Sequence, residues 1–281
     1  MALTAVLEPV EDSRLGALPA WDLRDLYPGP DSAELARAQA DAEAAAAAFA
    51  ARYQGKLATL EGEALGEAVA EYERIDELLT RVAAFADLVY ATGMNDSEVG
   101  RFAQALREKV TDISSHLVFF ALELNRLGEG ELTAKLKAPR LARFAPWLRD
   151  VRVFRDHQLS DDMERMLHEK QVAGRAAWVR LFDETVAALR FPVAGKTLTA
   201  AEALHLLSEP DAALRKEAAT AIGSVLADNV RLFALITNTL AKDKEIEDRW
   251  RRYPRPMSAR NLGNYVEDDV VDALVTAVRA A

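Results

Sequence analysis

Two long stretches of the chain place apolar residues at every third or fourth position. In residues 60–92 these positions are Leu65, Val69, Tyr72, Ile75, Leu79, Val82 and Phe85. In residues 97–127 they are Phe102, Leu106, Val110, Ile113, Leu117, Phe120 and Leu124. This spacing is that of one buried helix face, so the pattern predicts two long helices. Because only a short break separates them, we expect antiparallel neighbours in a bundle.

Capping signals mark further helices. Asp31 and Glu34 have the spacing of a capping box, which predicts a helix over residues 31–53. Asp161 and Glu164 have the same spacing, and the apolar pattern after them predicts one long helix up to about residue 189. Between these helices, Pro139 and Pro146 restrict the elements to short helices because proline cannot continue a helix.

Residues 190–199 are the one segment that favours strands. Phe191 and Val193 alternate with other residues around Ala194-Gly195, which is typical of a β-hairpin. Thr199 and Glu202 then predict a capped helix, and a further helix should begin at 208–210. The remainder reads as helical to residue 281, around a break at 253–256. The predicted fold class is therefore all-α, with long antiparallel helices in a bundle-like array and one small β-hairpin near 190–199.

The predicted organisation has four parts. The N-terminal part contains four prolines but also apolar side chains, among them Trp21, which a loose tail would not need. The four predicted parts are an extended docking arm (1–30), an N-terminal helical bundle (31–127), a second helical segment of the same lobe (128–189), and the hairpin with the following helices (190–281).

Composition excludes several function classes. A net charge of −10 argues against nucleic acid as the main partner, because such a surface needs concentrated Lys and Arg. The one dense basic cluster, at 248–256, fits a helix end and turn better than a phosphate patch. The chain has no cysteine, no signal-peptide pattern at its start and no uncharged run long enough to cross a bilayer. We therefore expect a cytoplasmic protein without membrane contact.

The pair His168-Glu169 begins like the zinc-protease motif His-Glu-x-x-His. Histidines at positions i and i+4 share a helix face and can bind one zinc ion, but the fifth residue here is Val172. The other histidines nearby in sequence, His157 and His205, lie on other predicted elements. We therefore interpret His168 as a surface or helix-packing residue, and a zinc enzyme that uses it as the least favoured alternative.

The other residues that could belong to a catalytic or binding site are better explained by helix capping, turns or core packing. His116 follows Ser114 and Ser115, yet it lies between apolar residues of a periodic helix, and no G-x-S-x-G turn holds either serine. The acidic pairs at 161–162 and 268–269 fit helix starts, and Gly195-Lys196 lacks the rest of a phosphate loop. Trp178, Leu181 and Phe182 form an apolar patch typical of core. The sequence thus assigns no catalytic residue, no metal ligand and no substrate-binding residue.

The order of several segments is nevertheless informative. "WDLRDLYPG" near the start, "LSDDMERML" with "GRAAWVRLFDE" at 159–184, "LTAAEALHLLSEPDAALRKEA", and residues 238–271 around Arg260, Asn261 and Asn264 occur in this order. In that order the chain resembles oligoendopeptidase F, a branch of the thimet-oligopeptidase-like zinc metallopeptidases. The resemblance covers nearly the whole chain, and it rests on several medium-strength matches.

The resemblance implies an enzyme roughly twice this length that hydrolyses short peptides in a channel between two mostly helical halves. Its zinc is bound by the histidines of His-Glu-x-x-His and a downstream glutamate, all in the C-terminal half. This sequence lacks that site, so no catalytic residue is carried over, and the chain is expected to contain no cofactor and to be inactive alone.

Two hypotheses follow for the function. The first is the N-terminal, non-catalytic portion of an oligoendopeptidase F-like zinc metalloendopeptidase, truncated before the zinc motif. Its partners would be short peptides and the missing catalytic half. An apolar surface should then be exposed where that half docks, and self-association through this surface is a further expectation. The alternative is a stand-alone helical binding or scaffold protein derived from that lobe.

Overall fold

The structure is a computed structural model that describes residues 11–12, 16–17 and 21–281. The helices of the first half are α1 (Ala33–Tyr53), α2 (Gly62–Thr92), α3 (Ser97–Ser115), α4 (Val118–Arg126), α5 (Glu129–Lys135), α6 (Pro139–Ala142) and α7 (Ala145–Arg152). Those of the second are α8 (Asp161–Lys170), α9 (Arg175–Ala188), α10 (Ala200–His205), α11 (Ala212–Asp228), α12 (Val230–Trp250), α13 (Ser258–Gly263) and α14 (Asp268–Ala280). Short 3-10 helices lie at Leu57–Thr59, Arg155–His157 and Leu206–Ser208.

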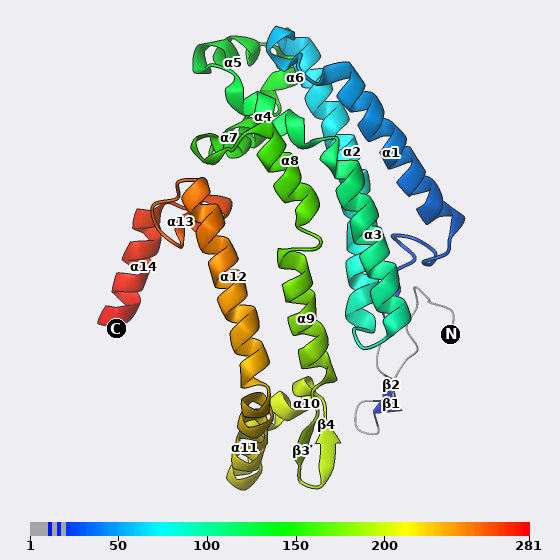
Figure 1. The fold of residues 1–281 in the computed structure, drawn as a ribbon, viewed down its shortest axis with the longest axis vertical. Helices are drawn as coiled ribbons and strands as arrows, with labels where there is room; N and C mark the ends of the chain where they lie inside the picture. The colour runs from blue at the N-terminus through cyan, green and yellow to red at the C-terminus, as the bar shows by residue number, and fades with distance from the viewer. Residues whose placement is uncertain (1–10, 13–15, 18–20) are drawn as a thin grey trace.

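Two small antiparallel strand pairs complete the described fold. β3 (Phe191–Val193) pairs with β4 (Lys196–Leu198), which confirms the predicted hairpin. Ala194 and Gly195 both have positive φ, as a two-residue hairpin turn requires. β1 (Glu11–Asp12) pairs with β2 (Gly16–Ala17), a pair that the sequence pattern did not predict. The all-α prediction is confirmed, because helices form nearly all of the described architecture (Figure 1).

The first half is held by α1, α2 and α3, which pack side by side along their length (Figure 1). The alanine-rich α1 buries Ala42 and Ala46 completely, and these small side chains allow the helix to approach its neighbours closely. Phe49 packs at the centre of an aromatic cluster with Phe119 and Phe120. Every residue of the two buried apolar clusters lies between Leu23 and Leu148.

Part of the predicted docking arm belongs to this core. Leu23 and Tyr27 are buried, and the Tyr27 ring packs edge-on against Phe85 of α2, with centroids 5.4 Å apart. The prediction is wrong for Trp21, whose side chain is 71% exposed. The rest of the arm, residues 1–20, lies outside the described side chains.

Tyr27 offers a test of this packing. Its hydroxyl is buried and has no hydrogen-bond partner in the described chain. Because an unpaired buried hydroxyl destabilises the folded state, Tyr27→Phe should raise the free energy of unfolding by about 1 kcal/mol. The matched control is Tyr53→Phe, which removes a hydroxyl that donates to Glu71 Oε2 at 3.1 Å and should lower stability. Thermal unfolding measures both, and a destabilised Tyr27→Phe protein would contradict the expectation.

Three predicted helix boundaries are wrong, each for a local reason. α1 is capped by Ser32, whose hydroxyl accepts from the Leu35 amide, and not by Asp31. The helix predicted over 97–127 breaks at His116 and Leu117, where Ser114 and Ser115 donate their hydroxyls to carbonyls three residues back. Such local bonds compete with the helical backbone pattern. α11 begins after the Asp211 cap, so the start predicted at 208–210 is too early.

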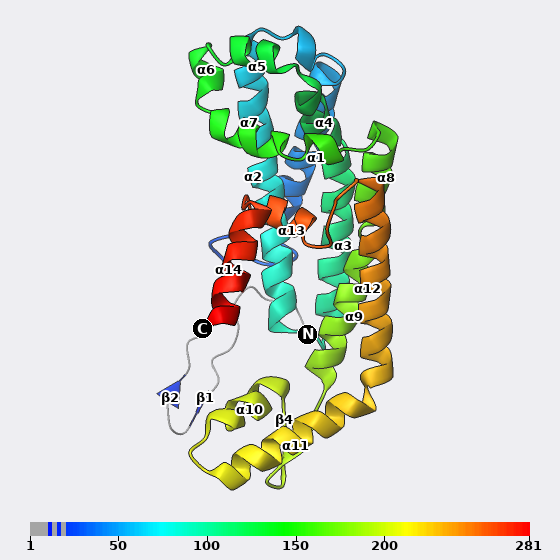
Figure 2. The ribbon, with the colours of Figure 1, turned by 90° about the vertical axis from the view of Figure 1, so that its left-hand side faces the viewer.

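The helix predicted from Ser160 to residue 189 is also interrupted. α8 ends at Lys170, and α9 begins after Gly174, whose backbone is non-helical, with φ −100° and ψ −116°. After this turn α9 continues beside α12, as both ribbon views show (Figures 1 and 2). Both α8 and α9 therefore face α12, on either side of the break.

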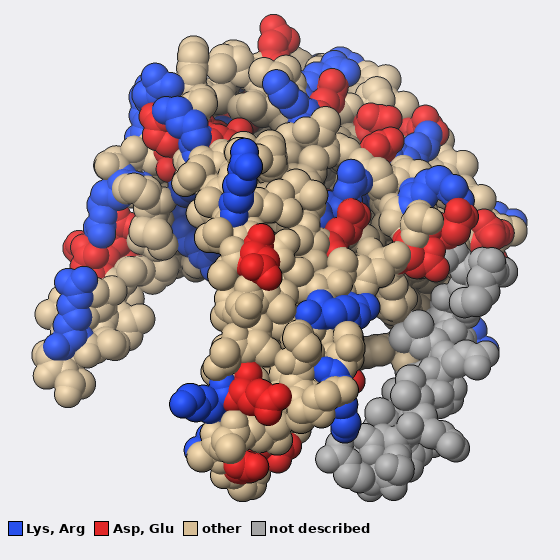
Figure 3. Space-filling view, turned by 60° about the horizontal axis from the view of Figure 1, so that its bottom comes forward, with Lys and Arg blue, Asp and Glu red and all other residues tan. Residues whose placement is uncertain are grey.

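In the second half α9 and α12 run beside α3, and α10, α11 and the hairpin lie beyond the end of the bundle (Figure 2). Except for Trp21 and Leu88, all the large apolar side chains that are exposed in the described chain lie beyond residue 160. On α14 they include Val270, Leu274 and Val278, each more than half exposed. Figure 3 shows a broad recess between the arm that ends in α14 and the arm that holds α11 and the hairpin. Residues 159–281 thus bury only a few apolar side chains, among them Phe191, Val193 and Ile236, and leave many exposed.

Candidate functional site

His168, which the sequence analysis interpreted as a surface or helix-packing residue and not as a metal ligand, is half-buried between two helices. It lies on α8 with its Nε2 atom 2.8 Å from Ser114 Oγ of α3. Glu169 pairs instead with Arg165 on the same helix, and Val172 lies in the turn after α8. No group of three His, Asp or Glu side chains in the described residues could hold a metal ion. The donor set of the described residues therefore does not fit the zinc that the resemblance implies for the whole enzyme.

The remaining histidines are separate from this position. His116 is exposed at the end of α3, and His205 lies on α10, 3.6 Å from Glu209. His157 has a defined environment: its Nδ1 lies 2.8 Å from the Arg251 carbonyl, and its ring stacks on Tyr253 with centroids 4.0 Å apart. His157 therefore marks a contact between the end of the first half and the end of α12.

This contact centres on a half-buried ion pair. Arg251 Nη1 and Nη2 donate to the two carboxylate oxygens of Glu164 at 2.7 and 2.9 Å. Arg251 Nε donates to Glu247 at 2.7 Å, and the Leu159 amide donates to Glu164 at 2.8 Å. Burial by itself raises the pKa of Glu164, but these hydrogen bonds and the guanidinium charge outweigh it and lower the pKa. The same carboxylates raise the pKa of Arg251.

The end of α12 is shaped to present these side chains. The Arg252 amide donates to the backbone carbonyl of Arg249, and the Tyr253 amide donates to the backbone carbonyl of Asp248. This is the pattern of a Schellman motif. Its turn residue is Arg252, with φ of 60°, where a glycine is usual. Tyr265 occupies the same position after α13, with φ of 53°. These two non-glycine turns bring Arg251, Tyr253 and Tyr265 to one place.

Sequence reasoning missed this site. The basic cluster at 248–256 does form a helix end and turn, as predicted, but Arg251 within it pairs with a carboxylate 87 residues away. Asp161–Glu164 marked the helix start, but Glu164 accepts from Leu159 and binds Arg251. Only an unusually dense run of arginines could have indicated a buried partner.

Two cavities flank the ion pair. A groove of about 610 Å³ between α8 and α12 is lined by apolar residues that include Met166, Ile246 and Trp250. A second cavity, of about 440 Å³, lies between α4, the segment before α8, and the ends of α12 and α13. We call this second space the junction cavity.

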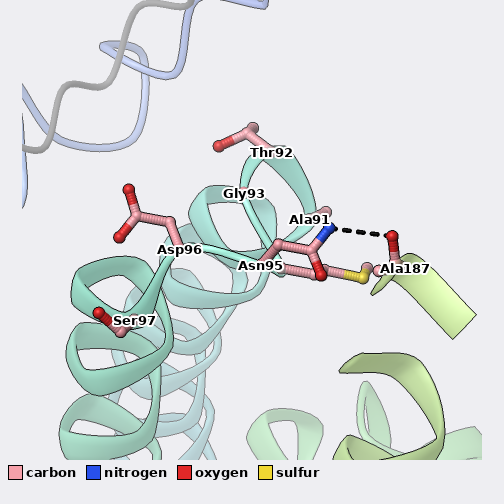
Figure 4. Close-up of a pocket in the computed structure, with 8 residues that line it drawn as sticks. Ala91, Thr92, Gly93, Asn95, Asp96, Ser97 and Ala187 are labelled. Carbon is pink, nitrogen blue, oxygen red and sulfur yellow. Dashed lines mark hydrogen bonds between the residues drawn. The ribbon is translucent and has the colours of Figure 1, made fainter. Parts of the chain in front are cut away.

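A larger depression lies elsewhere, at the loop between α2 and α3 (Figure 4). It is lined mostly by backbone and small side chains, and Asn95 Nδ2 donates across it to the Ala187 carbonyl at 2.9 Å. This bond ties the loop to the end of α9. Because the only charged lining residue is Asp96, whose side chain caps α3, the depression supplies no chemistry.

Two further sequence expectations concern surfaces. The patch of Trp178, Leu181 and Phe182 was predicted as core, but Leu181 and Phe182 are exposed on α9, with Phe182 touching only Phe233 of α12 among aromatic rings of the described chain. Asn261, from the family-like segment, is buried and donates to Asp268 Oδ1 at 2.7 Å, which fixes the corner between α13 and α14. Both acidic pairs lie in first turns, as predicted.

Residues 123–191 match the family model described as Oligopeptidase F. This segment is similar to the oligopeptidase F family. It runs from α4 through β3 and therefore contains the Glu164 side of the ion pair. The family resemblance drawn from the sequence is confirmed here. A comparison with curated proteins finds no match.

Two solved structures share the fold. The crystal structure of oligoendopeptidase-F from Enterococcus faecium matches with a TM-score of 0.77 and 18% identity, over 87% of this chain and 49% of that one. The structure of a candidate peptidase from Chlamydophila abortus matches with a TM-score of 0.56 and 19% identity, over 92% and 44%. The chain thus spans about half the length of the structures it resembles.

Among the described helices, none is by itself long and apolar enough to cross a membrane. The bent pair α11 and α12, which meet at 66°, passes that test jointly on length and composition.

Proposed function

We propose that this chain forms the N-terminal, non-catalytic lobe of an oligoendopeptidase F-like zinc metalloendopeptidase that hydrolyses short peptides in the cytoplasm. The observation that carries the proposal is the coincidence of an oligopeptidase F segment at 123–191 with a fold that covers about half of an oligoendopeptidase-F structure. The absence of cysteine supports the location, because a reducing compartment does not favour disulfides.

In this proposal the lobe has a structural role: it forms part of the wall of a peptide channel. The compact bundle of α1 to α4 forms a rigid wall, and the helices after residue 160 extend from it with their apolar side chains uncovered. A catalytic half packed on α9, α12 and α14 would cover those side chains and close a channel around a short peptide. The zinc ligands and the general base would come from that half, because the donor set here does not fit a metal.

The test compares this chain with the product of its gene continued past the codon for Ala281. We expect the longer product to contain His-Glu-x-x-His, to bind zinc and to cleave an internally quenched peptide until a chelator is added. The 281-residue chain should show no cleavage under the same conditions. A stop codon directly after Ala281, or chelator-sensitive cleavage by the chain alone, would overturn the proposal.

A second candidate is a stand-alone helical binding protein, which the apolar groove between α8 and α12 favours. An amphipathic helix could bind such a groove through apolar side chains. The same experiment distinguishes the two, since this candidate requires a stop codon and no catalytic extension.

A further inference from the structure

The groove between α8 and α12 has an apolar lining that the described chain leaves uncovered. It holds about 610 Å³ and lies across the ion pair from the junction cavity. Met166, Ile246 and Trp250 in its lining are 49%, 40% and 57% exposed. Large apolar side chains that lie together and stay exposed mark a surface for a partner. We call this surface the α8–α12 groove.

The two walls of the α8–α12 groove run antiparallel. Arg251, directly after α12, binds Glu164 in the first turn of α8, so the end of α12 lies beside the start of α8. Lys170 and Arg175 therefore lie at the opposite end of the groove, and both are exposed. Asp243 of α12 also lines this end and offsets only one of the two positive charges. The groove thus has a basic end and an end at the ion pair.

The last helix, α14, has an uncovered apolar face of matching length. Val270, Leu274 and Val278 recur at every fourth position and are 54%, 64% and 68% exposed, and we call them the α14 face. They span about 12 Å along the helix, and residues 243–250, which form the α12 wall of the groove, span about 10 Å. An amphipathic helix with such a face is the kind of partner that an apolar groove between two helices binds.

The charges of α14 favour one orientation in the groove. Asp269 precedes the α14 face and Arg279 follows it, and both are exposed. With the start of α14 at the basic end, Asp269 meets Lys170 and Arg175. Arg279 then meets the Glu247 carboxylate, toward the other end. The reverse orientation would place Arg279 against two cations. The helix therefore fits parallel to α12 and antiparallel to α8.

The α14 helix is held away from the groove of its own chain. Asn261 donates to Asp268, and Arg255 donates to Asp272 through two hydrogen bonds of 2.9 Å. These bonds fix the first turns of α14 on the segment before it. None of the described α14 residues lines the groove, and the ribbon views show α14 apart from α8 (Figures 1 and 2). Each chain thus presents a groove and a helix that do not meet within it.

We propose that the partner of the α8–α12 groove is a second copy of the chain, and that α14 of each copy lies in the groove of the other. A reciprocal exchange of this kind closes a dimer with two-fold symmetry and covers both α14 faces and both grooves. It gives the self-association expected from the sequence a defined site. The dimer belongs to the 281-residue chain, and a catalytic half that covers α14 would compete with it.

Analytical ultracentrifugation of the 281-residue chain tests this exchange. We expect twice the mass of one chain at high micromolar concentration. Leu274→Asp, in the α14 face, and Ile246→Asp, in the groove, each place a charge in the contact and should yield monomers. Both positions are exposed, so the fold should be kept, and the melting temperature checks this. The matched control is Leu235→Asp, at a position of α12 that is 55% exposed and outside the groove lining, which should remain a dimer.

A mixture of the two variants identifies the exchange itself. Leu274→Asp keeps an intact groove and Ile246→Asp keeps an intact α14, so one of the two contacts can form between them. Equimolar mixing should restore a dimer that is weaker than the native one. A monomeric native chain, a dimer that either variant keeps by itself, or variants that stay monomeric when mixed would overturn the proposal. Because only mass is measured, these outcomes are independent of the cleavage test of the proposed function.

Discussion

Replacing Arg251 by methionine is expected to lower the free energy of unfolding by about 3 kcal/mol. The substitution keeps most of the side-chain volume but leaves the Glu164 carboxylate half-buried without its cation. The side chains of this pair are only 18% and 14% exposed, so water replaces little of the lost interaction. Removing one partner of a buried ion pair typically costs 3–5 kcal/mol, about the amount expected here.

The double variant Glu164→Leu/Arg251→Met separates the effect of the unpaired charge from the effect of changed side-chain packing. It removes both charges, so it should be more stable than Arg251→Met alone. The matched control is Arg255→Met, which breaks a pair with Asp272 of similar geometry, at 2.9 Å, whose side chains are about half exposed. That variant should lose much less stability than Arg251→Met, because water screens an exposed pair. Urea unfolding measures all three, and equal losses for Arg251 and Arg255 would contradict the argument.

The same pair predicts a pH dependence. Folding lowers the pKa of Glu164 because, despite burial, the bonds from Arg251 and Leu159 favour the charged carboxylate. Its stabilising contribution is therefore complete above the pKa of glutamate in the unfolded chain, about 4.3, and is lost as the pH falls through the lower folded-state pKa. The stability difference between the native chain and the double variant should shrink in that acidic range.

Gly66→Ala is expected to destabilise the fold by about 2–3 kcal/mol. A Cβ atom at Gly66 of α2 would lie 2.8 Å from the Leu141 amide nitrogen and 2.9 Å from the Arg140 carbonyl carbon. Both are backbone atoms of α6, so they cannot move away as a flexible side chain would. The helices would have to separate, and overpacking of this kind costs 1–3 kcal/mol.

Gly100→Ala is the control for this substitution. Gly100 lies within α3, and nothing is within 4 Å of the Cβ position there. Alanine should therefore stabilise α3 by about 0.5–1 kcal/mol, since glycine loses more backbone entropy in a helix. Urea unfolding of both variants provides the measurement. A Gly66→Ala protein as stable as Gly100→Ala would show that α2 and α6 do not approach as described.

The sequence by itself determined those helices and turns that depend on residues close together in the chain. The apolar spacing of 60–92 predicted α2, and Thr199 with Glu202 predicted the capping box that the structure contains. The alternation around Ala194-Gly195 likewise predicted the hairpin, in whose turn both residues have positive φ. The order of motifs also indicated the family.

Only the tertiary structure decided the breaks and the long-range contacts. The helix breaks at His116 and at Gly174 occur inside apolar patterns that continue across them, so periodicity alone could not locate them. The pairing of Glu164 with Arg251, and the cavity around Asn125 and Gln158, join residues far apart in the chain. Such contacts depend on how whole helices pack, which no local spacing of residues encodes.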